Sequence, residues 1–205
     1  MISITTRNRP RVLEYTLKRT REAWSDMIIV IDDASDCAPL NEEIAKKYDC
    51  AYILNNTRWG IPRSKERGFR SLLSFNRQLW LDDDCFPLPG FWERLRRAEE
   101  EHPHLLHLKE WTHIKQEEDL GEVVRYSGAT ACAMYFHRDV YPLIHGFQAG
   151  FGYYGGWHHT LSEKVAGGYF ALKDSPFHSF DIDGVPRDFD SHFCSSLPQH
   201  ERIKK

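Results

Sequence analysis

Long apolar runs, a large net charge and paired cysteines are all missing from this sequence of 205 residues. No apolar stretch approaches the roughly 20 residues that cross a bilayer, and Met1 leads into a strand-like run rather than a signal peptide. A net charge of -3 argues against a global basic field for nucleic acid or anionic membranes. The five cysteines are scattered without a Cys-x-x-Cys motif, which indicates reduced thiols rather than disulfides or a zinc site. We therefore expect a cytoplasmic protein with no stable membrane insertion.

The composition and the pattern of residues 1–85 are typical of a folded α/β protein. Hydrophobic residues make up 41% of the chain and charged residues 28%, and the length suits one core. Strand-like runs alternate with helical patterns, and the apolar run MIIVI is typical of a strand buried on both faces. This order predicts a Rossmann-like, mostly parallel central sheet flanked by helices. We expect strands at 1–5, 27–31, 51–54 and 78–81 and helices at 11–24, 40–48 and 63–73.

The second half of the sequence has a less regular pattern. It predicts strands at 105–111, 123–126 and 129–136, helices at 91–101, 141–144 and 161–165, and an irregular tail from 174 onward. The sequence contains no internal repeat and no linker that would separate two domains. We expect a single domain over 1–205, in which 1–90 form the nucleotide-binding half and 91–205 form the acceptor-side half and tail.

The cluster Asp82-Asp83-Asp84 follows an apolar run at the end of the fourth expected strand. Adjacent carboxylates repel one another, so a buried cluster needs a cation or basic side chains to stay ionised. Carboxylate oxygens suit Mg²⁺ or Mn²⁺, which usually bridge a few carboxylates to substrate phosphates. In an extended segment Asp82 and Asp84 point to one side and Asp83 to the other. The alternative is a solvated acidic turn or a helix cap.

A second acidic pair, Asp32-Asp33, follows the strand expected at 27–31. Ligands of parallel α/β sheets lie at the carboxyl ends of the strands, so both acidic segments are placed where a site is expected. A strand-end carboxylate in such a sheet can accept hydrogen bonds from a base or a ribose. The alternative is that this pair only caps the following turn.

Four segments, taken in order, resemble the family 2 glycosyltransferases of GT-A fold. They are ISITTRNR at 2–9, IVIDDAS at 29–35, NNTRWGIPRSKERG at 55–68 and LWLDDDCFPLP at 79–89. The family has a first strand ending in a Thr/Arg loop, a strand ending in Asp-Asp-x-Ser, a helix start Gly-x-x-x-x-Arg-Asn-x-Gly and a strand ending in an Asp-x-Asp metal motif. Here Lys65 and Glu66 stand where the family usually has Arg and Asn.

The resemblance implies an inverting enzyme that uses a nucleotide-sugar, expected to be a UDP-sugar, with Mn²⁺ or Mg²⁺. It assigns the metal to Asp84 and Asp82, with His178 as a third ligand. Asp32 or Asp33 would contact the base, and Asp83 the ribose or the sugar. The full set implied for the donor is Thr5, Thr6, Arg7, Asp32, Asp33, Lys65, Asp82 and Asp83.

The resemblance continues at 127–138, SGATACAMYFHR, but departs at the expected general base. The family usually places Glu-Asp or Glu-His after an aromatic residue, and this sequence has His158-His159 after Trp157. Histidine can take the proton of an acceptor hydroxyl near neutral pH, so His158 and His159 are the predicted bases. Glu163 and Asp181 are the alternatives.

The acceptor is the least defined partner. We expect a carbohydrate, with a hydroxymethylated base of DNA as the alternative, since the basic segments 58–70 and 94–97 offer contacts for a nucleic-acid backbone. A solvated helix face is the simpler interpretation of both segments. A non-catalytic protein of the same fold that binds sugar-nucleotides or nucleic acid is the second functional hypothesis.

Overall fold

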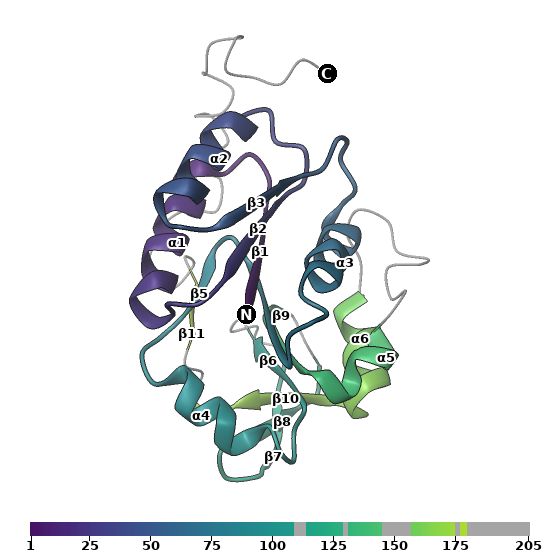
Figure 1. The fold of residues 1–205 in the computed structure, drawn as a ribbon. Helices are drawn as coiled ribbons and strands as arrows, with labels where there is room; N and C mark the ends of the chain where they lie inside the picture. Colours follow the sequence, from purple (N-terminus) through teal and green to yellow (C-terminus); the bar gives the residue numbers. More distant parts are fainter. Residues whose placement is uncertain (109–113, 129–130, 145–156, 175–176, 180–205) are drawn as a thin grey trace.

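The computed structural model describes residues 1–108, 114–128, 131–144, 157–174 and 177–179 (Figure 1). A nine-stranded sheet runs through it in the order β3-β2-β1-β4-β9-β6-β10-β8-β7. Followed from pair to pair, seven of these strands point the same way, and β9 and β8 point the opposite way. The α/β prediction with a mostly parallel central sheet flanked by helices is therefore confirmed.

The first half of the sheet is wholly parallel. Its strands are β1 (Ile2–Thr6), β2 (Ile28–Asp32), β3 (Ala51–Leu54) and β4 (Arg77–Asp82). Every residue of β1 and β2 is buried, as the continuous apolar runs predict for strands covered on both faces. In the register, Thr5 of β1 lies beside Asp82 and Thr6 beside Asp32. The polar ends of three strands therefore meet at one edge of the sheet.

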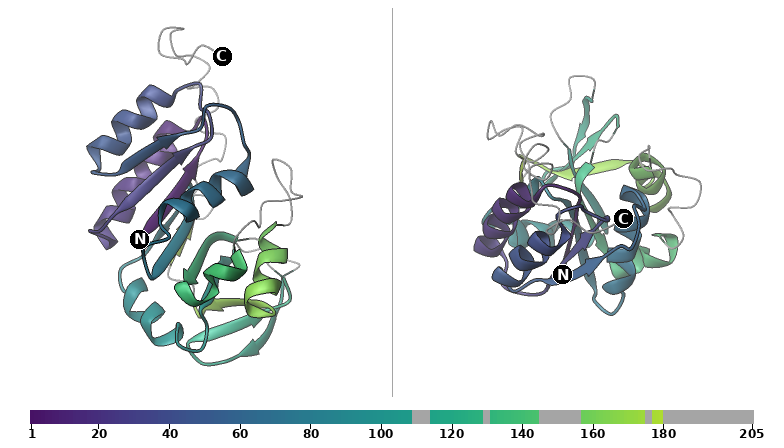
Figure 2. Two further views of the ribbon diagram at one scale, coloured as in Figure 1. Left: turned by 45° about the vertical axis from the view of Figure 1, so that its right-hand side comes forward. Right: turned by 90° about the horizontal axis from the view of Figure 1, so that it is seen from above.

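Three helices flank this parallel half. α1 (Pro10–Ala23) and α2 (Ala38–Lys47) lie on one face and α3 (Ile61–Ser71) on the other (Figures 1 and 2). Each begins with proline in its first turn, a position that needs no backbone donor. Gly68 brings α3 close to β1, because a Cβ there would lie 2.9 Å from the Ser3 hydroxyl oxygen.

The second half of the sheet is mixed. Its strands are β6 (His104–Leu108), β7 (Gln116–Asp119), β8 (Val123–Tyr126), β9 (Ala131–His137) and β10 (Tyr169–Leu172). β9 joins the halves by pairing antiparallel with β4 and with β6. The helical segments are α4 (Phe91–Ala98), the 3₁₀ turn Arg138–Val140, α5 (Tyr141–Ile144) and α6 (Trp157–Ala166).

Four strands were not foreseen by the sequence pattern. β7 and β10 extend the main sheet, and β5 (Cys85–Pro87) pairs with β11 (Phe177–Ser179) in a separate two-stranded ribbon. The prediction of an irregular tail from 174 is therefore wrong at β11, which draws its order from a partner far away in the sequence. Helix α4 also ends three residues before the predicted boundary.

Four of the five cysteines lie within the described residues. Cys37, Cys50, Cys85 and Cys132 are buried and form no disulfide with one another, while Cys194 lies outside the described residues. Within the same parts of the chain, no helix has the length and apolarity needed to cross a membrane.

Candidate active site

A cleft of about 220 Å³ opens at the carboxyl ends of β1, β2 and β4. Three arginines and four aspartates contribute to its wall, so opposite charges face one another across a small space. The lining residues are Thr5, Thr6, Arg7, Arg9, Asp33, Arg58, Gly60, Ile61, Asp82, Asp83 and Asp84. Parallel α/β sheets commonly bind ligands in this position.

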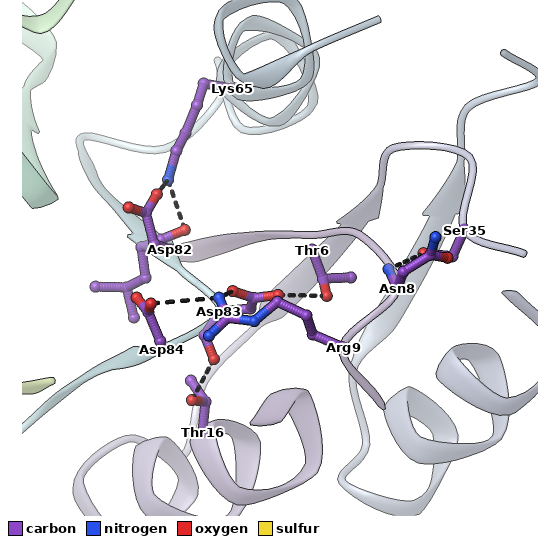
Figure 3. Close-up of polar contacts among 10 residues, drawn as sticks. Thr6, Asn8, Arg9, Thr16, Ser35, Lys65, Asp82, Asp83 and Asp84 are labelled. Atoms are coloured by element: carbon purple, nitrogen blue, oxygen red, sulfur yellow. Dashed lines mark hydrogen bonds and ion pairs between the residues drawn. The ribbon is translucent and has the colours of Figure 1, made fainter. Parts of the chain in front are cut away.

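Arg9 connects two of the three clustered acids. Its Nη1 lies 2.6 Å from Asp83 Oδ1 and 3.3 Å from Asp84 Oδ2 (Figure 3). Thr6 Oγ1 donates to Asp83 Oδ2 at 2.7 Å, and Thr16 Oγ1 donates to the Asp83 carbonyl at 2.5 Å. The prediction that Asp83 points away from Asp82 and Asp84 is wrong: all three line the cleft, because the chain turns after β4 and brings Asp83 and Asp84 onto one guanidinium.

Asp82 is held from another direction by Lys65 of α3. The Lys65 ammonium lies 2.9 Å from Asp82 Oδ1 and donates to the Leu81 carbonyl at 2.6 Å. Lys65 is buried and does not line the cleft, so its ammonium supports the end of β4 instead of standing in the open donor space. Glu66, where the family usually has Asn, is buried and pairs with Arg70 of the same helix at 2.7 Å.

The ionised form of Asp83 is disfavoured by its surroundings unless a positive charge lies nearby. Burial raises the pKa of this carboxyl above its usual range, and the neighbouring Asp84 and Asp82 raise it further. The Arg9 guanidinium and the Thr6 hydroxyl act in the opposite direction by stabilising the ionised form. A second cation near these acids would therefore favour the doubly ionised pair.

The acids also have the donor chemistry of a magnesium or manganese site. Hard carboxylate oxygens suit both ions, which commonly take one or two protein carboxylates and complete their shells with water and phosphate oxygens. Among the described residues, no three His, Cys, Asp or Glu side chains gather into a closed metal cage. Asp83 and Asp84 already share a cationic group. The residues present therefore fit an open cation site that a substrate would complete.

Asp32 and Asp33 have different roles despite being adjacent. The Asp32 carboxylate is fully buried and accepts hydrogen bonds from the Ser35 backbone N–H, the Asn41 amide and the Tyr52 hydroxyl, each at 2.7 Å. It does not line the cleft. Its expected contact with a nucleotide base has no place in this structure, because the protein itself occupies the carboxylate.

Asp33 does line the cleft and shapes its wall. Oδ1 accepts from the Trp59 backbone N–H at 2.7 Å, the Ser64 hydroxyl at 3.0 Å and the Asn55 amide at 3.1 Å. Oδ2 accepts from the Gly60 backbone N–H at 2.9 Å. These bonds hold the loop before α3, and they leave Oδ2 with more acceptor capacity than Oδ1.

Thr5 and Arg7 contribute uncommitted polar atoms. Within the described parts of the chain, Thr5 Oγ1 and Arg7 Nε are buried without a hydrogen-bond partner, and both residues line the cleft. Arg9 and Arg58 line it too, although neither is among the residues that the family resemblance implies for the donor. For Arg9 the available signal was its position in the segment 2–9, but its acidic partners lie 74 and 75 residues away.

The histidines predicted to act are placed only by their backbones. His178 lies opposite Phe86 in the β11–β5 ribbon, so its strand runs beside the segment that follows Asp84. His158 and His159 fall in the first turn of α6. The alternative base Glu163 is exposed on α6, whereas Asp181 lies outside the described residues, as does the segment 145–156.

Comparisons with known proteins show which family and which solved structures this chain resembles. The model of the family described as Glycosyl transferase family 2 matches residues 1–150, whereas no curated protein matches the chain. The structure of GalNAc-T7 with UDP, GalNAc and Mn²⁺ superposes with a TM-score of 0.73 at 12% identity, covering 97% of this chain and 51% of that one. S. aureus TarS in complex with UDP-GlcNAc gives 0.63 at 12% identity, covering 98% and 68%. The chain thus spans about half the length of GalNAc-T7, and the likeness is one of fold.

Proposed function

This chain belongs to glycosyl transferase family 2, and we propose that it is an inverting, metal-dependent enzyme that moves a sugar from a nucleotide-sugar to an acceptor hydroxyl. One observation carries the proposal. The cleft at the strand ends brings the buried carboxylates of Asp83 and Asp84 together with arginine side chains. It therefore offers anionic ligands for a divalent cation and cationic ligands for a diphosphate in one place.

The donor is expected to be a UDP-sugar. Arg7 lines the cleft, its Nε has no hydrogen-bond partner among the described residues, and a guanidinium can bind phosphate oxygens through two parallel hydrogen bonds. Asp33 Oδ2 accepts from the Gly60 N–H and has capacity for a second donor, so it is the acceptor suited to the N3–H of uracil. The complexes of GalNAc-T7 with UDP and of TarS with UDP-GlcNAc support this choice of nucleotide.

Asp84 and Asp82 would hold Mn²⁺ or Mg²⁺, with His178 as a further ligand. A cation bound there would supply positive charge that stabilises the departing diphosphate. Asp83, fixed by Thr6 and Arg9, would orient the ribose or the sugar beside it. Lys65 would keep the Asp82 carboxylate in place through its 2.9 Å ion pair.

The acceptor hydroxyl must lose a proton as its oxygen bonds to the anomeric carbon and the carbon–diphosphate bond breaks. We assign this proton to His158 or His159, because imidazole accepts protons near neutral pH. The helix that carries them is tied to the sheet, since the Ser162 hydroxyl lies 2.8 Å from His104 Nε2 of β6. Glu163 and Asp181 remain the alternatives for this role.

A donor-by-acceptor screen that detects released nucleoside diphosphate tests the proposal directly. Turnover of a UDP-sugar should stop in EDTA and return with Mn²⁺. Asp84→Asn should abolish it, while the control Asp119→Asn, on the exposed edge strand β7, should retain it. Full activity in EDTA would remove the metal role, and no turnover with any donor would favour the non-catalytic binding hypothesis.

The same screen addresses the base and the acceptor. His158→Ala should lower turnover without weakening UDP binding, whereas a large loss of UDP affinity would make His158 a donor-site residue. We propose a carbohydrate acceptor. DNA containing hydroxymethylated bases as the sole acceptor in the screen would overturn that choice.

A further inference from the structure

His104, the first residue of β6, makes hydrogen bonds with both of its ring nitrogens inside the protein. Its Nδ1 lies 2.9 Å from the Tyr135 carbonyl oxygen of β9, and its Nε2 lies 2.8 Å from the Ser162 hydroxyl oxygen of α6. His104 and Ser162 are both completely buried. Because β9 is the neighbour of β4 in the sheet, one imidazole joins α6 to the strand beside the one that ends at the acidic cluster.

We propose that His104 is a positioning residue of the transfer reaction: through Ser162 it sets where the first turn of α6 stands relative to the cleft. This inference rests on the proposed function, because His158, His159 and the alternative base Glu163 all belong to α6. It does not depend on which of these three side chains takes the proton of the acceptor.

The Ser162 hydrogen bond lies close to the candidate bases along the helix. Ser162 follows His159 by three positions and His158 by four, so the three backbone positions fall on one face of α6. With a rise of about 1.5 Å per residue, the two histidine positions are only about 4.5–6 Å farther along the axis. Since α6 packs on β6 and β10 and ends just before β10 begins, its first turn lies toward the carboxyl ends of these strands, where the cleft opens (Figure 1).

The apolar contacts of α6 hold it to the sheet without fixing its rotation. Leu161 is buried in a cluster with Trp80 and Phe136, and such burial has no preferred direction. A hydrogen bond, by contrast, needs its two atoms at a set distance and angle. The Tyr169 hydroxyl also bonds Glu163, but that carboxylate is exposed, so water can replace this bond. The buried bond to His104 is therefore the contact that fixes the rotation and height of the helix.

Turnover and UDP binding, measured on the same proteins, test this role. We would compare the unsubstituted chain with Ser162→Ala, His104→Phe and the double variant, at a temperature at which thermal melts show each to be folded. Turnover is read as UDP released with the donor and acceptor that the screen selects, and UDP binding in Mn²⁺ is read by calorimetry. Tyr141→Phe is the matched control, because its hydroxyl belongs to the same apolar cluster but donates to the Phe75 carbonyl, outside α6.

Ser162→Ala should lower kcat about 10- to 100-fold, because a displacement of about 1 Å can cost a factor of roughly 100. Its Kd for UDP should stay unchanged. His104→Phe and the double variant should lose the same factor in kcat, since all three break one bond. His104→Gln, whose amide offers a donor and an acceptor, should retain more turnover than His104→Phe, and this pair decides the question if Ser162→Ala does not fold. Tyr141→Phe should keep its kcat.

Unchanged kcat in Ser162→Ala and His104→Phe would overturn the inference and favour a base outside α6, such as Asp181. An equal loss in Tyr141→Phe would also overturn it, because kcat would then follow stability alone. So would a parallel loss of UDP affinity, because the bond would then shape the donor cleft. In these three cases the unsubstituted protein still releases UDP, and the proposed function stands. Absence of turnover in the unsubstituted protein with every donor would overturn the proposed function and the inference with it.

Discussion

Acidification should weaken the fold through His104, which ties the sheet to helix α6. The imidazole is fully buried, with Nδ1 2.9 Å from the Tyr135 carbonyl oxygen and Nε2 2.8 Å from the Ser162 hydroxyl. A carbonyl can only accept, so Nδ1 carries the proton and Nε2 accepts from Ser162. Its ring stacks on Phe136 with centroids 4.4 Å apart. A second proton, on Nε2, would force the Ser162 hydroxyl to turn from donor to acceptor and would bury a positive charge.

Burial lowers the pKa of His104 from 6.5 to about 4 in the folded protein. Between these values the unfolded chain binds more protons than the folded one, so stability is full above pH 6.5 and is lost as the pH falls toward 4. At about 1.4 kcal/mol per pKa unit, the loss from this single group between pH 8 and pH 4 is about 3 kcal/mol. Asp83, whose pKa burial raises, acts in the opposite direction over the same range.

Because several groups titrate over this range, the effect of His104 is measured as a difference in the free energy of unfolding between two proteins. Urea unfolding of the unsubstituted chain and of His104→Gln is followed from pH 8 to pH 4. The variant should be less stable at pH 8, and its deficit should shrink by about 3 kcal/mol at pH 4, since glutamine does not titrate. Two curves that run parallel over this range would refute the reasoning, whatever the deficit at pH 8.

Three further substitutions test the parts that shape the cleft. Asp33→Asn should cost about 1.5–3 kcal/mol in urea unfolding, because it removes the charge that the Gly60 N–H and its neighbours bind; unchanged stability would contradict this. Gly68→Ala should cost about 1–3 kcal/mol by overpacking, and adding Ser3→Gly should restore most of it; additive effects in that double-mutant cycle would exclude a direct clash. Lys65→Met should weaken Mn²⁺-dependent UDP binding in calorimetry, with partial recovery in Lys65→Arg; full affinity in Lys65→Met would show that Asp82 needs no support.

The first half of the fold was predictable because its signals are local. Its four strands were expected within one or two residues of their ends, since each is an apolar run bounded by turn-forming or polar residues. β7 gave no such signal: its sequence, QEED, is charged and exposed, and only its pairing with β8 makes it a strand. β11 is three residues long and exists through its pairing with β5, about ninety residues earlier.

The site was predictable as a location but not as a set of contacts. Strand order alone placed both acidic segments at one edge of the sheet, where the cleft is found. The partners of Asp83 could not be read from the pattern, because Thr6 and Arg9 lie 77 and 74 residues away. Nor could periodicity foresee that the chain turns at Asp83, since alternation holds only while the strand stays extended.

Asp32 and Asp33 show that the position of a residue in a sequence motif does not by itself tell whether its side chain can reach a ligand. Both lie at the end of β2, so the sequence could not say which of them would contact a ligand. In the structure, three protein donors surround the Asp32 carboxylate, whereas Asp33 borders the cleft. Three donors crowd Asp33 Oδ1 while Oδ2 receives one, so under the proposed function Oδ2 is the oxygen with more room to accept from a base. The proposed function thus gives Asp33 two roles, holding the loop before α3 and binding the nucleotide, and it predicts that a change that loosens this loop weakens nucleotide binding as well.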